Sequence, residues 1–107
     1  MTDFPNESFT IEVADDGAIV VTGDLDMAAG PLLDATLVQR EEQHPVVIDV
    51  ANVFFIDSSG LRSLLDASRR AQARDSEVVL RSVGPEVARL LEITGTTGQF
   101  RIDRRDV

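Results

Sequence analysis

The fold of this chain is decided by residues 54–61, which read Phe54-Phe55-Ile56-Asp57-Ser58-Ser59-Gly60-Leu61. An apolar run stops there at a cluster of small polar residues. Beyond Gly60, side chains recur at the i, i+3, i+4, i+7 spacing that is typical of a helix with one buried stripe. They are Leu61, Leu64, Leu65, Ser68 and Ala71. The junction is therefore predicted to be a helix N-terminus.

Small polar residues at such a junction have two interpretations. Asp and Ser are favoured at a helix start because their side-chain oxygens accept hydrogen bonds from amides that the first turn leaves unpaired. If Ser58 is the capping residue, Ser59 stands at the first helical position with no structural duty, and Gly60 leaves the approach to its hydroxyl open. A free hydroxyl there is a candidate for modification. The same residues, Asp57 included, also fit a cap and a turn with no further role.

Composition predicts one acidic domain. The 107 residues, 43% of them hydrophobic, fit a single domain over residues 1–107, with an ordered core at about 8–102 and polar termini at 1–7 and 103–107. Ten basic against nineteen acidic residues give a net charge of −9, which repels nucleic acids and anionic membranes. The chain has no cysteine, no signal-peptide pattern and no apolar run of about 18 residues. We expect a soluble cytoplasmic protein that binds no nucleic acid and spans no membrane.

The N-terminal half predicts a hairpin and a helix. Alternation predicts a strand over residues 9–13, and a turn at 15–17 joins it to a more apolar strand over 18–22. A loop, Gly23-Asp24-Leu25-Asp26, follows. The next helix is expected to start at Gly30-Pro31 and to end before Pro45. Its expected apolar side consists of Leu33 and Leu37, widened by Leu32 and Val38.

The remainder alternates strands and helices. We expect a strand over 46–50 and then three apolar side chains that fill the core beneath the junction, namely Phe54, Phe55 and Ile56. The central helix should run to about Arg74. After it come a strand over 77–81, a helix between Gly84-Pro85 and Gly95, a short edge strand over 98–102 and a loose tail. This order predicts an α/β sandwich with a mixed four- to five-stranded sheet and crossover helices.

Four segments in this order resemble the STAS domain, the fold of bacterial anti-sigma factor antagonists. Gly23-Asp24-Leu25-Asp26 resembles the family's Gly-Glu-Leu-Asp loop, and Val46-Val47-Ile48-Asp49-Val50 resembles its third strand. Asp57-Ser58-Ser59-Gly60-Leu61 matches the family's phosphorylation motif, and residues 87–95 resemble the segment before the last strand. The resemblance covers nearly the whole chain.

The resemblance implies a phosphorylation switch. In antagonists of this class the second serine of the motif is phosphorylated by the anti-sigma factor, an ATP-dependent serine kinase, which places the acceptor at Ser59. The match to the loop aspartate near the acceptor is Asp26, and Asp57, Ser58 and Gly60 would support the site. By the same resemblance, the unphosphorylated form binds the kinase and frees the sigma factor, and a phosphatase, expected to be of the PP2C type, restores that form.

Two departures from the family pattern limit what carries over. Asp24 stands where the family usually has Glu, and the chain stops at Val107, so we expect the final helix of many members to be absent. Partner contacts are expected from residues near the junction: Asp24, Met27, Arg62 and Ser63.

Other functions remain open at this point. An enzyme is disfavoured because hydrolase and phosphate-loop motifs are missing and His44 stands at a helix end before Pro45. A STAS scaffold of a stress-signalling assembly, or a regulatory subunit of a lipid-transport ATPase, would need the same fold. Nucleotide binding at the helix start is disfavoured by the negative charge, and we expect no metal site and no cofactor.

Overall fold

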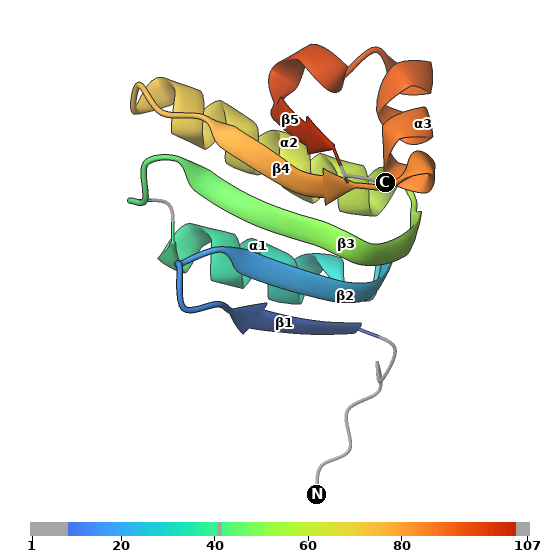
Figure 1. Cartoon of the computed structure of the whole chain (residues 1–107), viewed down its shortest axis with the longest axis horizontal. Coiled ribbons are helices and arrows are strands. Elements are labelled where there is room, and N and C mark those ends of the chain that lie inside the picture. The colour runs from blue at the N-terminus through green and yellow to red at the C-terminus, as the bar shows by residue number, and fades with distance from the viewer. Residues whose placement is uncertain (1–8, 41, 105–107) are drawn as a thin grey trace, which may run out of the picture.

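The computed structural model describes residues 9–40 and 42–104, which form a five-stranded sheet, three α-helices and one 3-10 helix (Figure 1). The elements run in the order β1 (Phe9–Val13), β2 (Ile19–Leu25), α1 (Gly30–Gln39), β3 (Val46–Ile56), α2 (Ser58–Ala73), β4 (Val78–Val83), α3 (Pro85–Thr94), η1 (Thr97–Gln99) and β5 (Arg101–Arg104). The predicted α/β class is confirmed.

The sheet is mixed, and its strands lie side by side in sequence order. β1 and β2 form the predicted antiparallel hairpin, and the three other neighbouring pairs, β2–β3, β3–β4 and β4–β5, are parallel. Parallel strands end at the same edge of a sheet. The last residues of β2 and β3, Leu25 and Ile56, are therefore paired neighbours, and the segments that follow them start α1 and α2 at one edge.

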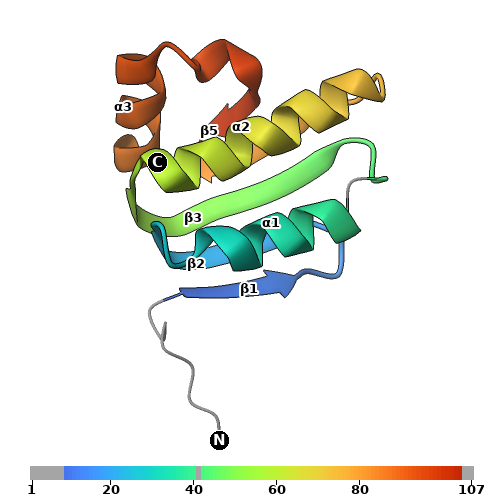
Figure 2. The same ribbon diagram turned by 180° about the vertical axis from the view of Figure 1, so that it is seen from behind.

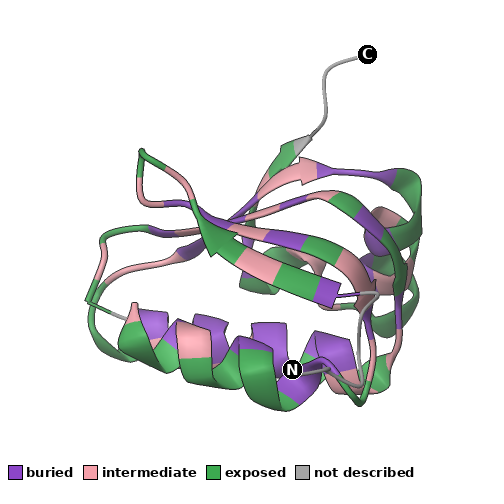
Figure 3. Ribbon diagram, turned by 90° about the horizontal axis from the view of Figure 1, so that it is seen from below, coloured by how far each residue is buried: buried purple, intermediate pink, exposed green. Residues whose placement is uncertain are grey.

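Helices α1 and α2 contact each other and lie on the same face of the sheet (Figure 2). Their buried residues face the strands (Figure 3). Leu33 and Leu37 of α1 are buried as expected, but Leu32 and Val38 are each 52% exposed, so the expected widening of the apolar side is wrong. A ten-residue helix that lies over one face of the sheet buries only a narrow stripe, and its flanks face solvent.

β3 is longer than expected and irregular. Its register with β2 runs from Val20↔Asp49 to Thr22↔Asn52 and then to Asp24↔Phe55, so β3 holds one extra residue in each step. Such bulges interrupt the alternation of side chains. The buried residues of β3 accordingly change spacing along the strand: Val46, Ile48, Val50, Val53 and Ile56.

The bulges decide where the aromatic residues before the junction point. Phe54 is 60% exposed and Phe55 is 50% exposed, whereas Ile56 is buried. The expectation that all three side chains fill the core is therefore wrong for the two phenylalanines. Two exposed aromatic side chains instead stand directly before the start of α2.

The C-terminal elements largely follow their sequence signals. Pro85 starts α3, and Gly95 ends it with φ 70°. The expected strand over 98–102 begins later, because the Ser68 hydroxyl donates to the Gln99 carbonyl and residues 97–99 form η1 beside α2. Asp103 and Arg104, expected in a loose tail, belong to β5, where they pair in register with β4. The rest of that tail, residues 105–107, and the polar lead-in 1–7 lie outside the described residues.

The face of the sheet away from α1 and α2 carries an ionic cluster. The Arg81 guanidinium donates to a carboxylate oxygen of Asp16 in the hairpin turn and to one of Asp49 on β3, both at 2.9 Å. The Asp16 carboxylate also accepts from the Ala18 amide, and the Asp49 carboxylate accepts from the Ala51 amide at the first bulge. The Ala18 amide and then Arg81 hold the pKa of Asp16 below its ordinary value.

We predict that the pairing of Asp16 makes the fold less stable in acid. A carboxyl whose pKa is lowered by folding adds stability above its unfolded pKa of about 3.9, and that stability is lost as the pH falls through the folded pKa. In urea titrations from about pH 7 to pH 2, the free energy of unfolding should therefore fall less steeply below about pH 4 in Asp16→Asn than in wild type. Asp15→Asn is the matched control, because it also removes one carboxylate, but the carboxylate of Asp15 forms no ion pair with Arg81. Parallel curves for Asp16→Asn and wild type would contradict the prediction.

Candidate functional site

The start of α2 is capped by a carboxylate. Asp57 is the N-cap residue in extended conformation, and its Oδ1 accepts from the amides of Ser59 at 2.9 Å and Gly60 at 3.0 Å. The alternative in which Ser58 caps the helix is therefore wrong, and Ser58 is the exposed first helical residue. One carboxylate can accept hydrogen bonds from both amides, and its negative charge is stabilised by the positive end of the helix dipole. These two effects explain why Asp57, and not Ser58, is the N-cap.

This cap leaves the Ser59 side chain without a structural role. Ser59 is the second residue of α2, and its side chain is half-buried. Its amide is bound to Asp57, while none of the hydrogen bonds found among the described residues involves its hydroxyl. The reactive atom of the predicted acceptor is therefore free of competing partners within residues 9–40 and 42–104.

Gly60 is needed for close packing. A Cβ built on Gly60 would lie 2.2 Å from the carbonyl oxygen of Leu25, the last residue of β2. The same oxygen accepts a hydrogen bond from the Asp57 amide at 3.2 Å. Gly60 was expected to leave open the approach to Ser59, but it is buried. Glycine is required at this position because the helix start touches the backbone of β2.

Ser59 lies at a shallow hollow of about 290 Å³ between the starts of α1 and α2. Four of its lining residues were candidates from the sequence, and the structure brings them together: Met27, Ser59, Arg62 and Ser63. Four others had not been singled out: Gly30, Pro31, Asp34 and Asp66. The hollow thus combines two hydroxyls, one guanidinium, two carboxylates and an exposed thioether.

Two candidate residues, Asp24 and Asp26, lie at the end of β2 and in the turn that leads into α1. The expected loop at 23–26 is mostly strand, because β2 continues to Leu25, and Asp24 is half-buried opposite Phe55. The Asp26 carboxylate accepts from the amides of Ala28 and Ala29, both at 3.1 Å. Asp26 therefore orders the turn into α1, and it is not among the lining residues of the hollow.

The candidate partner contacts differ in exposure. Met27 is 73% exposed, and Arg62 is exposed on α2. Ser63 is only 3% exposed, because it lies beneath Gly30 of α1, and it offers little surface to a partner. A β-carbon added at Gly30 would lie 3.6 Å from the Ser63 hydroxyl oxygen, so the two helices approach closely at this point.

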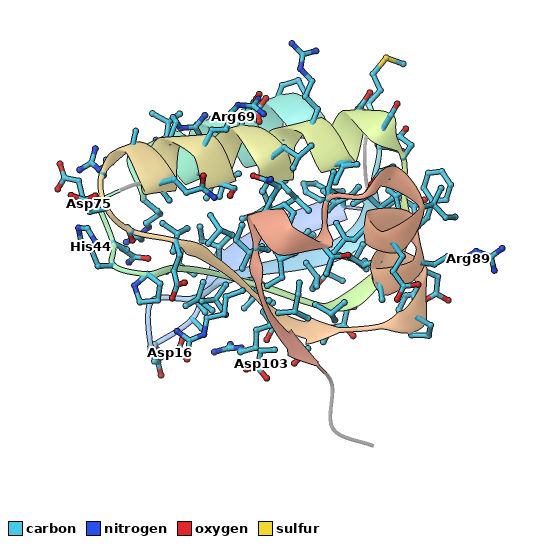
Figure 4. All side chains as sticks on the ribbon, turned by 90° about the horizontal axis from the view of Figure 1, so that it is seen from above. Asp16, His44, Arg69, Asp75, Arg89 and Asp103 are labelled. Atoms are coloured by element: carbon cyan, nitrogen blue, oxygen red, sulfur yellow. The ribbon has the colours of Figure 1, made fainter. Side chains whose placement is uncertain are left out.

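Arg62 is the one cation of the hollow within the described residues. Asp66, one turn further along α2, forms an ion pair with Arg69, which lies on the outer side of that helix (Figure 4). No ion pair joins Arg62 to a carboxylate within residues 9–40 and 42–104. Asp34 was missed from the sequence because only the packing of α1 against α2 brings it to the hollow that Ser59 lines. Asp66 lies on the same helix as Ser59, two turns further along, and this helical spacing was its signal in the sequence.

Comparisons with known proteins decide the family. The STAS domain profile matches residues 10–105. The anti-sigma-B factor antagonist of Listeria monocytogenes is 33% identical over 86 residues, which cover 78% of this chain and 75% of that protein. The anti-sigma-B factor antagonist of Staphylococcus epidermidis is 32% identical over 79 residues, covering 72% and 73%. The chain belongs to the STAS-domain family of anti-sigma factor antagonists.

Solved structures share the fold of this STAS domain. An anti-sigma factor antagonist from Mycobacterium paratuberculosis is 25% identical, with a TM-score of 0.72 over 95% of this chain and 90% of that one. The anti-sigma factor antagonist SpoIIAA in its unphosphorylated form is 21% identical, with a TM-score of 0.68 over 88% and 86%. The phosphorylated form of Bacillus SpoIIAA gives a TM-score of 0.64 at 20% identity over 88% and 89%.

In the part of the chain that the structure describes, no group of three or more His, Cys, Asp or Glu side chains is placed to hold a metal ion. Within the same residues, no helix is long and apolar enough to cross a membrane.

We predict that Gly60→Ala destabilises the fold by about 1–3 kcal/mol, because the new methyl group would overlap the Leu25 carbonyl and neither backbone can move without breaking the Asp57–Leu25 hydrogen bond. Gly98→Ala is the matched control: no atom lies within 4 Å of the added carbon, and a change within about 0.5 kcal/mol is expected. Urea unfolding measures both. Equal stability of the two variants would show that the close approach does not constrain the fold.

Proposed function

We propose that this STAS domain acts in the cytoplasm as a phosphorylation-controlled antagonist of an anti-sigma factor. In the unphosphorylated form it binds an anti-sigma factor serine kinase and releases the sigma factor, and phosphorylation of Ser59 ends that binding. The observation that carries the proposal is the free, half-buried hydroxyl of Ser59 at the hollow, next to a helix start that Asp57 already caps. The relatives named anti-sigma-B factor antagonists support the same role.

This chain supplies only the acceptor hydroxyl to the phosphoryl transfer. A bond forms between the Ser59 Oγ and the γ-phosphorus of ATP on the kinase, and the bond from that phosphorus to the oxygen bridging the β-phosphate breaks. ADP leaves, and the hydroxyl proton passes to a base on the kinase. Mg²⁺ arrives with the ATP. In this proposal the STAS domain is the substrate of the reaction and performs no catalysis itself.

Charge explains why the phosphate would oppose binding. A phosphoserine carries about −1.5 to −2 charges at pH 7, and the chain already has a net charge of −9. Asp34 and Asp66 line the same hollow as Ser59. Burying an uncompensated phosphate beside them in an interface costs several kcal/mol, and about 1.4 kcal/mol is a tenfold loss of affinity.

The fold itself should tolerate the modification. The positive end of a helix dipole stabilises a nearby anion by about 0.3–1 kcal/mol. Ser59 is also partly exposed, so a phosphate can reach solvent without displacing core side chains. The phosphate would then change what the surface can bind while the packing of the sheet and helices is kept. A phosphatase of the PP2C type would remove it and restore the binding form.

Exposed apolar side chains at the hollow and near the end of β3 fit a protein partner. Met27 lines the hollow and is 73% exposed, and Phe54 and Phe55 precede the helix start with 60% and 50% of their surface exposed. Large apolar side chains are enriched in the centres of protein interfaces, where their burial supplies affinity. We therefore expect the kinase to contact these three residues together with Arg62 and Asp24.

We predict that Ser59→Asp weakens binding of the kinase at least tenfold, because it adds a fixed negative charge at the hollow. Ser59→Ala should bind normally and accept no phosphate from the kinase and ATP. Ser58→Asp, on the exposed neighbour, is the control for added charge and should lose much less affinity. Calorimetric titration and intact-mass measurement give the two readouts. All variants should melt within about 4 °C of wild type.

Equal binding by Ser59→Asp and wild type would contradict the switch, and unfolding of Ser59→Asp would contradict the tolerance of the fold. Phosphate transfer to Ser59→Ala would place the acceptor elsewhere. If the protein copurifies with a transport ATPase and ignores the kinase, the regulatory-subunit role replaces this one.

A further inference from the structure

Arg62 is placed to interact with a phosphate on Ser59. The two residues are three positions apart on α2, and both line the hollow between α1 and α2. Side chains at this spacing lie on the same face of a helix, one turn apart. Arg62 is exposed and forms no ion pair among the described residues, so its guanidinium is available for a new anion.

Two of the usual anion ligands of this helix start are already occupied. An anion at such a position normally accepts hydrogen bonds from the free amides of the first turn. In this chain the amides of Ser59 and Gly60 donate to the Asp57 carboxylate. To bind these two amides, a phosphate on Ser59 would have to displace that carboxylate. Displacement would release the cap that starts the helix, so a cationic side chain is the favoured partner.

The charges around the hollow leave one candidate for that partner. Arg62 is the cationic lining residue found among the described residues, and the carboxylates are Asp34 from α1 and Asp66 from α2. Asp66 is paired with Arg69 on the outer side of the helix. A phosphate with close to two negative charges and three acceptor oxygens attracts a guanidinium more strongly than a single carboxylate does.

We propose that Arg62 binds the phosphate of phosphorylated Ser59 as an ion pair within α2, an inference that rests on the phosphorylation of Ser59 proposed above. The pair has two effects. It compensates only part of the phosphate charge in the folded chain, so a net negative charge still opposes the partner. It also withdraws from the surface a guanidinium that in the unphosphorylated form is free to bind an acidic side chain of the partner. Phosphorylation then adds a repelling charge and removes an attracting one in the same step.

The pair can be tested on the full chain with phosphoserine encoded at position 59, which needs no kinase. A guanidinium near a phosphate monoester lowers its second pKa, which is about 6 in free phosphoserine. Phosphorus NMR titrations should give a second pKa about 0.5 lower in wild type than in Arg62→Gln, with Arg62→Lys in between. Arg89→Gln is the matched control, because Arg89 is an exposed residue that points away from the molecule on α3 (Figure 4). It should titrate like wild type.

An identical titration of wild type and Arg62→Gln would overturn the ion pair. That outcome is distinct from failure of the proposed function, because encoded phosphoserine reports on pairing whether or not a kinase modifies Ser59. The partner contact has its own readout: unphosphorylated Arg62→Gln should bind the kinase about tenfold more weakly than wild type. Unchanged binding would overturn the role of Arg62 in the interface while leaving the ion pair standing.

Discussion

The arrangement of this molecule depends on one backbone contact, between the carbonyl of Leu25 and the first turn of α2. The Leu25 carbonyl oxygen accepts a hydrogen bond from the Asp57 amide. Because Gly60 has no side chain, the helix can approach closely enough for this bond to form. The contact fixes the end of β2 against the start of α2, and the chain that leaves Leu25 begins α1 at the same edge of the sheet. The hollow exists because both helix starts are held there.

The same contact determines which groups of the first turn are free. With Asp57 in the cap position, its carboxylate takes the amides of Ser59 and Gly60, and the Ser59 hydroxyl is left without a partner among the described residues. Asp57 thus accepts the hydrogen bonds of the helix start, and the Ser59 hydroxyl is not needed for that role. A modification of Ser59 can then alter the charge of the surface without removing a hydrogen bond that the fold requires.

Sequence reasoning succeeded where a local rule decides the structure. The helix that begins at Pro85 and ends at Gly95, and the hairpin turn before β2, follow from the backbone preferences of single residues. It failed where several residues compete for one role. Asp57 and Ser58 are both good caps. Asp57 takes the role because its carboxylate accepts two amides of the first turn while its own amide donates to the Leu25 carbonyl.

Longer-range features could not be read from the pattern. The two bulges of β3 turn Phe54 and Phe55 outward, although an apolar run before a helix is typical of a buried strand. Asp34 reaches the hollow only because α1 packs beside α2, and Ser63 is covered by the same packing. The candidate acceptor could be found from its motif, while its charged surroundings required the structure.

The central claim is that partner binding and phosphate on Ser59 exclude each other. The most direct measurement is to isolate the protein from its source cell, separate the partner-bound from the free fraction without denaturation, and map phosphate on each by peptide mass spectrometry. The account predicts an unmodified Ser59 in the fraction bound to a sigma-controlling kinase and phosphoserine at that position in the free fraction. Phosphoserine at position 59 in the bound fraction, or an unmodified serine in both, would contradict it.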